Sequence, residues 1–549
     1  MNSTVNQSLI FIFLMVFCGI ANADICAIAK EYIQQDDVRS FLAEYQEPYL
    51  LEDEQGTTVY ASQKLPNIVF ILADDLGYEE IGSYGQERIN TPNLDKLAGE
   101  GLRFTEHYAG NAVCAPSRSV LMSGRHPGNN GVRANRTTTG KIPLMSANVL
   151  TIAEMLKARG YTTGAFGKWG LGMPDTTGSP LNQGFDTFFG YYNQRHAHSH
   201  YPEYLWNDSR KVFLNNNPPV AGHEQLPAES DPNDPLAYKR YKGDDYAPDR
   251  INAAALDFVR KNKNQPFFLY YPTILPHLAL HIPDEYLKPY LKLGWKEQPF
   301  TSQNKLGYTP HLTPKAAYAA MVTRLDHYVG EVVKLLDDLG LADDTLIVFT
   351  SDNGTSALDD EVDATFFSSV GELRGLKGSL YEGGIRVPAI VRWPGKIQAN
   401  TVTKHISGFE DWYSTFMELT STKDPSAFDT DGQSLLPLLL GKNILPREFL
   451  YREYGVNPGW QSVRVGNWKA IRPNLDAGDL SVELYDLDKD AAEKFNVASK
   501  HPDITEELTK IMDREHSESK LYPLPSLDTS AFIEKLEYRL RSAYHDLVN

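Results

Sequence analysis

The sequence predicts an α/β protein in which a mostly parallel sheet is covered by helices on both faces. From Leu65 onward, apolar runs rich in β-forming residues alternate with helical patterns, which is typical of this class. After about residue 445 the pattern changes to short strand-like runs and one helix, which predicts a smaller C-terminal antiparallel sheet. The length of 549 residues is enough for one large domain and one smaller one.

The individual elements follow in order along the chain. Strands of the large sheet are predicted over residues 67–73, 162–166, 266–271, 345–350 and 387–393. The helices between them are predicted over 91–102, 151–159, 251–262 and 314–339. In the C-terminal part, strands are predicted over 447–454, 461–471 and 483–487, with a helix over 503–516. We therefore expect a catalytic α/β domain over residues 65–445 and an α+β subdomain over 446–549.

The N-terminus predicts export. An apolar run over residues 9–17 is followed by Ala21-Asn22-Ala23, a small-residue cleavage site, so residues 1–23 read as a signal peptide. The run is too short to span a bilayer as a stable helix. Residues 24–64 are expected to form an N-terminal extension with a helix over 25–45. We expect a periplasmic or secreted protein cleaved near Ala23, with no membrane span.

The cysteine content bears on possible disulfides, and the net charge bears on the class of binding partner. Of three cysteines, Cys18 would leave with the signal peptide and Cys114 lies in a motif described below, so Cys26 has no partner for a disulfide. The net charge of −18 argues against nucleic acids and anionic membranes as partners. An anionic substrate would need a local basic pocket.

Polar residues lie just beyond the predicted strands. Ligands bind beyond the carboxyl ends of the strands in an open parallel sheet, so these residues predict one shared site. They are Asp74 and Asp75, Lys168, His277, and Asp352 with Asn353.

Four of these residues offer only oxygen ligands. Asp74, Asp75, Asp352 and Asn353 suit a hard cation such as calcium or magnesium. The alternative is that the adjacent aspartates simply begin the next loop or cap a helix.

Residues 114–125 read Cys-Ala-Pro-Ser-Arg-Ser-Val-Leu-Met-Ser-Gly-Arg. This run resembles the maturation motif of type I sulfatases, in the alkaline phosphatase superfamily. The resemblance implies that a formylglycine-generating enzyme oxidises Cys114 to formylglycine (3-oxoalanine), whose hydrate is the nucleophile. The alternative is a buried structural cysteine.

Further motifs resemble the same family. They are Asp74-Asp75, Gly167-Lys168-Trp169-Gly170-Leu171-Gly172, Pro276-His277, Ser351-Asp352-Asn353-Gly354, and Gly375-Leu376-Lys377-Gly378 with Tyr381-Glu382-Gly383-Gly384. The resemblance implies a large mixed sheet of the alkaline-phosphatase-like fold. It also implies that Asp74, Asp75, Asp352 and Asn353 bind Ca²⁺, with Mg²⁺ less favoured, together with an oxygen of modified Cys114. By the same resemblance Arg118 orients the hydrate, Lys168 and Lys377 hold sulfate oxygens, and His277 protonates the leaving group.

One position departs from the family pattern. The family's histidine after Gly-Lys-Trp is Gly170 here. A nearby histidine-rich stretch, residues 193–202, could compensate. Alternate spacing would place His196, His198 and His200 on one face of an extended segment. We expect His196 or His198 to contact the substrate; a zinc site and a structural role are the alternatives.

These observations predict an exported sulfatase. Three carboxylates, a divalent ion and three basic residues would leave the pocket with a charge of about +2, which suits a sulfate monoester. Residues 194–206 look similar to bacterial polysaccharide sulfatases, so a sulfated glycan of the carrageenan, chondroitin or other galactose type is the expected substrate. The alternatives are a phosphomonoester or phosphonate hydrolase of the same superfamily and a non-catalytic protein that binds sulfated glycans.

Overall fold

The computed structural model describes residues 50–52, 58–60, 65–302, 307–356, 362–420, 430–456 and 458–528. The predicted signal peptide and the helix over 25–45 lie outside these residues, so they and the predicted export stay predictions. The chain divides into two compact units, Met1–Gln63 and Lys64–Asn549. In the first, β1 (Leu50–Glu52) pairs antiparallel with β2 (Thr58–Tyr60). No helix in the described residues is long and apolar enough to cross a membrane.

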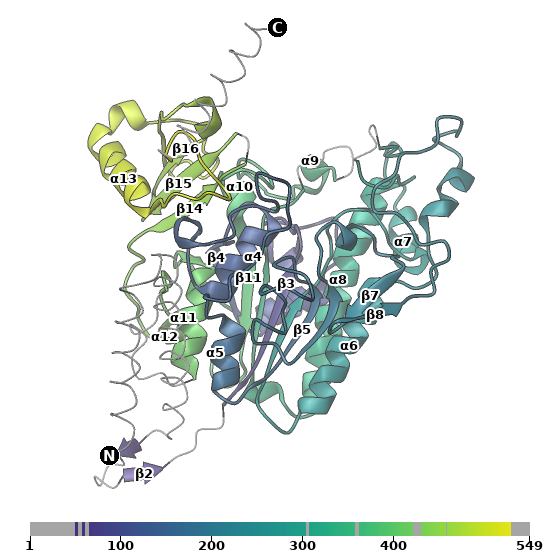
Figure 1. Ribbon diagram of the computed structural model, residues 1–549, viewed down its shortest axis with the longest axis horizontal. Coiled ribbons are helices and arrows are strands. Elements are labelled where there is room, and N and C mark those ends of the chain that lie inside the picture. The colour runs from purple at the N-terminus through teal and green to yellow at the C-terminus, as the bar shows by residue number, and fades with distance from the viewer. Residues whose placement is uncertain are drawn as a thin grey trace, which may run out of the picture. The chain divides into compact units, whose positions relative to one another are not determined.

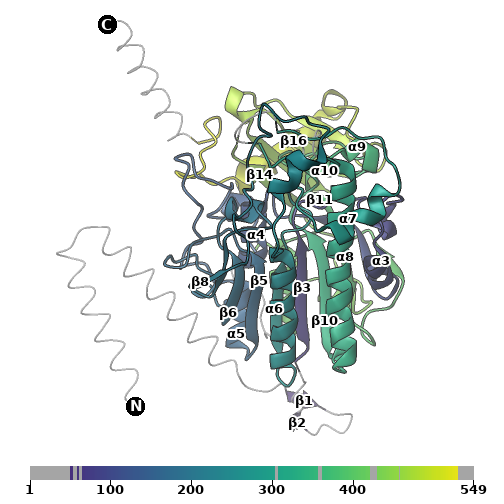
Figure 2. The same ribbon diagram turned by 90° about the vertical axis from the view of Figure 1, so that its right-hand side faces the viewer.

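An eleven-stranded mixed sheet forms the centre of the second unit (Figures 1 and 2). Its strand order is β12-β4-β11-β10-β3-β9-β5-β6-β7-β8, with β13 beside β4. The central strands β10, β3, β9, β5 and β6 are parallel, whereas the β10–β11, β11–β4, β6–β7 and β7–β8 pairs are antiparallel. The predicted fold class is therefore confirmed. The strands are β3 (Asn67–Ala73), β4 (Leu102–Tyr108), β5 (Thr162–Lys168), β6 (Thr187–Tyr191), β7 (Tyr204–Asn207), β8 (Arg210–Phe213), β9 (Phe267–Pro272), β10 (Thr345–Ser351), β11 (Arg386–Arg392), β12 (Thr401–Thr403) and β13 (Ser407–Gly408).

Both faces of this sheet are covered. In β3, alternate residues enter different cores: Val69 and Ile71 on one face, Phe70 and Leu72 on the other. The first core packs against α3 (Pro92–Gly99), α6 (Ala247–Asn262) and α8 (Pro314–Asp338). The second packs against α4 (Cys114–Ser123), α5 (Ile152–Ala158) and α11 (Glu410–Leu419). Figure 1 shows α5 and α11 on one side of the sheet and α6 and α8 on the other. Because β3 is buried on both faces, its sequence is continuously apolar.

A second, four-stranded antiparallel sheet follows. It contains β14 (Leu450–Tyr454), β15 (Trp460–Val465), β16 (Trp468–Arg472) and β17 (Glu483–Asp486), and α13 (Pro502–Glu515) packs against it. The single strand predicted over 461–471 is wrong, because a hairpin turn at Gly466, with φ +56°, divides it into β15 and β16. The boundary near residue 445 stays a prediction.

The remaining described α-helices are short. They are α7 (Asp284–Leu291), α9 (Ala364–Phe367), α10 (Glu382–Ile385) and α12 (Leu436–Leu439).

The end of β5 requires a glycine. Gly167 has φ +135°, and a Cβ there would lie 1.9 Å from the carbonyl oxygen of Pro272 in β9. No side chain fits that space, so glycine lets the two strands approach closely just before Lys168.

Gly167→Ala should therefore destabilise the fold by about 2–3 kcal/mol, since it combines backbone strain with a clash against backbone. Denaturant unfolding measures this. Gly99→Ala, at the end of α3 where a Cβ meets nothing within 4 Å, is the matched control and should be neutral or slightly stabilising. Equal stability of the two variants would contradict the close approach.

Candidate functional site

The predicted site residues come together at the carboxyl edge of the large sheet. Asp74 and Asp75 directly follow β3, Lys168 is the last residue of β5, and Asp352 with Asn353 follows β10. The register of β3 and β10 aligns Ala73 with Ser351. The residues that follow, Asp74-Asp75 and Asp352-Asn353, therefore lie side by side; we call them the acidic pairs. All five side chains are buried.

The acidic pairs are directly connected. The backbone N–H of Asp75 donates to Asp352 Oδ1 (3.2 Å), and Asn353 Nδ2 donates to Asp75 Oδ1 (2.7 Å). Cys114, the first residue of α4, places its Sγ 3.4 Å from Asp74 Oδ1 and 4.0 Å from Asp75 Oδ1. Ligand atoms of Asp74, Asp75, Cys114 and His277 all lie within 4.8 Å of one another.

This group can hold a metal ion. Asn353 Oδ1 is buried and has no hydrogen-bond partner, although an unpaired buried carbonyl oxygen is costly. The same amide donates to Asp75, and the neighbouring carboxylates of Asp74 and Asp75 offer hard oxygen ligands. Asp352 is placed differently, because its Oδ2 is bound by an arginine. The donor set fits a hard divalent cation.

Two lysines flank Cys114. Lys168 Nζ lies 2.7 Å from Asp74 Oδ2 and 3.4 Å from Cys114 Sγ. Lys377 Nζ lies 2.6 Å from Asp75 Oδ2 and 3.7 Å from Cys114 Sγ. Burial lowers the pKa of Lys377, but the negative groups around it, Asp75 foremost, together outweigh burial and hold that pKa well above its ordinary value. Positive charge is thus fixed on two sides of Cys114.

Arg118 joins three parts of the site. Its Nε and Nη2 donate to Asp352 Oδ2 at 3.0 and 2.8 Å, and Nη2 lies 3.5 Å from Asp74 Oδ2. Its Nη1 donates to the carbonyl oxygen of Lys168. Arg118 lies four positions after Cys114 on α4, so both side chains lie on the same face of the helix. The buried Arg118 side chain therefore links the carboxylates of Asp352 and Asp74 to the end of β5.

The thiol of Cys114 is a poor nucleophile as it stands. Burial raises its pKa to about 12, although Lys168 and Lys377 act in the opposite direction. A thiol is reactive as the thiolate, so at neutral pH this one is almost wholly in its unreactive form. The two lysines beside Cys114 suit an anionic ligand, but the protonated thiol is not a nucleophile.

His277 closes the side of the cluster near Asp75. Its Nε2 lies 3.5 Å from Asp75 Oδ2, and its Nδ1 contacts the carbonyl oxygen of Leu278, which requires a proton on Nδ1. Burial, with the charges of Lys168 and Lys377, holds its pKa well below the ordinary value. Nε2 is therefore available to exchange a proton with a ligand.

A second layer of rings backs His277. The His198 ring stacks on it, with centroids 4.8 Å apart and an interplanar angle of 17°. His198 Nδ1 lies 2.6 Å from His223 Nε2, so one of these imidazoles donates to the other. Tyr308 stacks on His223 with centroids 4.8 Å apart.

The extended segment expected for the histidine-rich stretch is wrong. His196–His198 form a 3₁₀ turn, so the three rings do not share a face. His196 packs on Tyr191 and Tyr204, whereas His200 packs against His281. Of the three, His198 is the one whose ring stacks on the His277 ring. The Asn193 side-chain oxygen accepts hydrogen bonds from the N–H groups of Arg195 and His196 and closes the turn, a feature that the alternation of histidines does not indicate.

Sequence reasoning missed three residues near this layer. His223 and Tyr308 lie in segments without a recognisable motif, and Gln194 was seen only as part of a longer resemblance. The amide of Gln194 lies where a side chain on Gly170 would be. In the sequence, the only indication of this contact is Gly170 itself, which stands where the resembled family has a histidine.

The C-terminal sheet holds the loop that carries Lys377. Tyr381 Oη donates to Glu483 Oε2 (2.7 Å) in β17, and Lys469 Nζ in β16 donates to Glu382 Oε1 (2.8 Å). The Glu382 N–H donates to Glu493 Oε2 (2.7 Å). The second sheet thus positions one side of the site.

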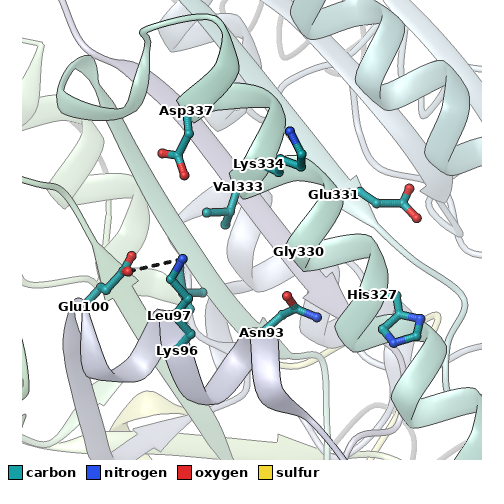
Figure 3. Close-up of a pocket in the computed structure, with 10 residues that line it drawn as sticks. All are labelled: Asn93, Lys96, Leu97, Glu100, His327, Gly330, Glu331, Val333, Lys334 and Asp337. Carbon is teal, nitrogen blue, oxygen red and sulfur yellow. Dashed lines mark ion pairs between the residues drawn. The ribbon is translucent and has the colours of Figure 1, made fainter.

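A separate cavity of about 430 Å³ lies between α3 and α8 (Figure 3). It is lined mostly by residues with charged or amide side chains, among them Asn93, Lys96, His327 and Lys334. It contains no residue of the Cys114 cluster, so it is not part of this site.

Comparison with known proteins agrees with the geometry. The sulfatase family matches residues 66–422, and the N-sulphoglucosamine sulphohydrolase C-terminal family matches residues 376–518. An N-acetylgalactosamine-6-O-sulfatase of Bacteroides thetaiotaomicron is 30% identical, covering 82% of this chain and 93% of that enzyme. Human arylsulfatase A is 33% identical, covering 81% of this chain and 87% of that enzyme.

Solved structures show the same architecture. Ps i-CgsB, crystallised with k-i-k-neocarrahexaose, is 26% identical with a TM-score of 0.68, covering 87% of this chain and 98% of that one. A phosphonate monoester hydrolase of Agrobacterium radiobacter is 20% identical with a TM-score of 0.57, covering 82% of this chain and 95% of that one, and shares the fold. With sulfatase sequences matching over most of its length, this chain belongs to the sulfatase family and is an enzyme that hydrolyses sulfate esters.

Proposed function

We propose that this sulfatase acts on a sulfated glycan through formylglycine at position 114 and a bound Ca²⁺. The observation that carries the proposal is the surroundings of Cys114. Its Sγ lies within 4.0 Å of two carboxylates and within 3.7 Å of two lysines. A group placed there meets both a cation site and the charges that would hold an anion.

Conversion of Cys114 to formylglycine would supply the nucleophile that its protonated thiol does not provide. A formylglycine-generating enzyme would oxidise the side chain to an aldehyde, which hydrates to a geminal diol. One hydroxyl gives up its proton and attacks sulfur; the bond from sulfur to the sugar oxygen breaks, the sugar leaves as an alcohol once that oxygen is protonated, and a sulfate ester remains on the enzyme. The second hydroxyl then loses its proton, the C=O bond reforms, and inorganic sulfate leaves. A single alcohol would remain sulfated, whereas the diol regenerates the aldehyde.

The cation would be held by Asp74, Asp75, Asp352 and Asn353, whose oxygens suit calcium better than the smaller, stricter magnesium. When bound, it would supply charge neutralisation for the carboxylates and Lewis-acid polarisation of an oxygen ligand. The unpartnered Asn353 Oδ1 supports this assignment.

The lysines would bind the sulfate. Lys168 is buried, whereas 18% of the Lys377 side chain is exposed. Substrate would therefore enter beside Lys377, and both ammonium groups would turn from the carboxylates toward sulfate oxygens. Arg118 stays on Asp352 and orients the residue-114 side chain through α4. Fixed cations of this kind stabilise negative charge in the transition state more effectively than water does.

His277 would protonate the leaving oxygen. Its Nδ1 proton is committed to Leu278, so Nε2 is the atom that would carry the transferred proton. Binding a sulfate anion between Lys168 and Lys377 would offset the two lysine charges that, after burial, lower the pKa of His277. A sugar alkoxide is a poor leaving group, so this proton matters most for a glycan.

Several observations support a sulfated glycan as substrate. The relatives include an enzyme named for N-acetylgalactosamine 6-O-sulfate and a structure solved with a neocarrahexaose. In this chain, His196 packs on Tyr204, whose neighbour Phe213 is 67% exposed. Lys211 Nζ lies 3.9 Å from the Tyr204 ring centroid. Exposed aromatic and basic side chains suit an anionic sugar chain, and the predicted export suits a polysaccharide.

Cys114→Ala should abolish sulfate release, because no other residue can form the diol. The assay is turnover of a sulfated oligosaccharide panel, with phosphate monoesters as the comparison that separates a phosphohydrolase. Cys26→Ser is the control and should keep full activity. Mass spectrometry of the peptide spanning residue 114 should show formylglycine in the wild type. Substantial activity in Cys114→Ala would overturn the proposal.

His277→Ala should slow release of sulfate from a sugar about 10²- to 10⁴-fold, whereas 4-nitrophenyl sulfate should be affected far less. A nitrophenolate leaves without protonation, which is the reason for the difference. The comparison of kcat on the two substrates measures it, with His327→Ala as the control. Equal losses on both substrates would argue against proton donation by His277.

A further inference from the structure

Gln194 occupies the space beside Gly170 that a side chain at position 170 would otherwise fill. Gly170 lies two residues beyond Lys168 with φ +82°, and its N–H donates to the carbonyl oxygen of Tyr192 (3.1 Å). A Cβ on residue 170 would lie 2.3 Å from Gln194 Nε2 and 3.0 Å from its Cδ. The carboxamide therefore fills the volume that a side chain at position 170 would enter.

Both polar atoms of this amide lack partners. Gln194 Nε2 and Oε1 are buried, and neither has a hydrogen-bond partner in the described part of the chain. It is the only described side chain with two such atoms. An unpaired buried amide costs roughly 1–3 kcal/mol, so its retention calls for a ligand.

The backbone holds this amide in place. Asn193 Oδ1 accepts hydrogen bonds from the N–H groups of Arg195 (2.7 Å) and His196 (3.4 Å), and Ala197 N–H donates to the Asn193 carbonyl oxygen (3.2 Å). Four residues after Gln194, His198 stacks on His277. The segment thus runs from Gly170, two residues beyond Lys168, to His277, and the hydrogen bonds of Asn193 fix the turn that carries Gln194.

The chemistry of the two atoms selects the ligand. A sulfate oxygen only accepts hydrogen bonds, so sulfate alone would leave Gln194 Oε1 unpaired. An ammonium group only donates, and would leave Nε2 unpaired. A hydroxyl both donates and accepts, and so satisfies both atoms of the amide.

We propose that Gln194 is a substrate-contacting residue that binds a hydroxyl group at the reaction centre, an inference that rests on the proposed function. Two hydroxyls have this chemistry: one on the sugar that carries the sulfate, and one on the hydrated aldehyde at residue 114. A sugar hydroxyl makes Gln194 a specificity residue; the hydrate makes it a positioning group for the nucleophile.

Gln194→Met keeps the length of the side chain and removes both hydrogen-bonding atoms. Its kcat/KM should fall about 10- to 100-fold on a sulfated oligosaccharide that the wild type desulfates. A similar fall on 4-nitrophenyl sulfate identifies the hydrate as the ligand, since that substrate has no sugar hydroxyl. A fall on the oligosaccharide alone identifies the sugar. Rates are normalised to the formylglycine content measured by mass spectrometry.

Stability separates a ligand-binding amide from a structural one. Because the amide has no partner in the protein, the unfolding temperature of Gln194→Met should equal or exceed that of the wild type. Gln433→Met is the matched control, since this amide lies before α12, donates to Leu445, and is not part of the cluster. It should leave kcat/KM unchanged.

Unchanged kcat/KM on both substrates would overturn the inference while leaving the proposed function intact. A lower unfolding temperature would also overturn it, because the amide would then have a structural partner. Wild-type enzyme that releases no sulfate from either substrate would instead refute the proposed function. Gln194→Asn, which keeps both polar atoms but withdraws them, should show a smaller loss than Gln194→Met.

Discussion

Compensation of buried charge is the constraint on which this structure depends. Three buried carboxylates, Asp74, Asp75 and Asp352, face Lys168, Lys377 and Arg118 over distances of 2.6–3.5 Å. Removing one partner of a buried ion pair typically costs about 3–5 kcal/mol, so no member is dispensable to the folded state. The same charges make the site responsive to ligands, because a divalent cation on the carboxylates would release the lysines for an anion. The same ion pairs therefore compensate the buried charges and provide the groups that would bind a cation and an anion.

The sheet explains how residues so distant in sequence reach one point. Parallel strands deliver their carboxyl ends to a single edge, and the aligned ends of β3 and β10 place the acidic pairs together. Gly167 allows β5 to approach β9, which brings Lys168 to the same edge. Lys377 arrives from a loop, and the C-terminal sheet compensates for that loop's lack of regular structure through Lys469 and Glu483. The second sheet is therefore part of the site's support.

Much of this was predictable from sequence, for physical reasons. Buried parallel strands such as β3 and β10 are continuous apolar runs with chemistry at their ends, so both strands and site residues could be located. Flanking strands such as β4 and β7 carry polar residues and alternate, which weakened the signal. The contacts of His198 with His223 and of Gly170 with Gln194 depend on the 3₁₀ turn at His196–His198 and on tertiary packing. No spacing in the sequence encodes those contacts.

The acidic pairs and residue 114 are proposed to form a single site for a cation and a sulfate. A crystal structure of the purified enzyme grown with calcium and sulfate tests it most directly. We expect one calcium ion on oxygens of Asp74, Asp75, Asp352 and Asn353, with formylglycine at position 114. We also expect a sulfate between Lys168 and Lys377. Calcium bound elsewhere, or an unmodified cysteine with both lysines still on the carboxylates, would contradict it.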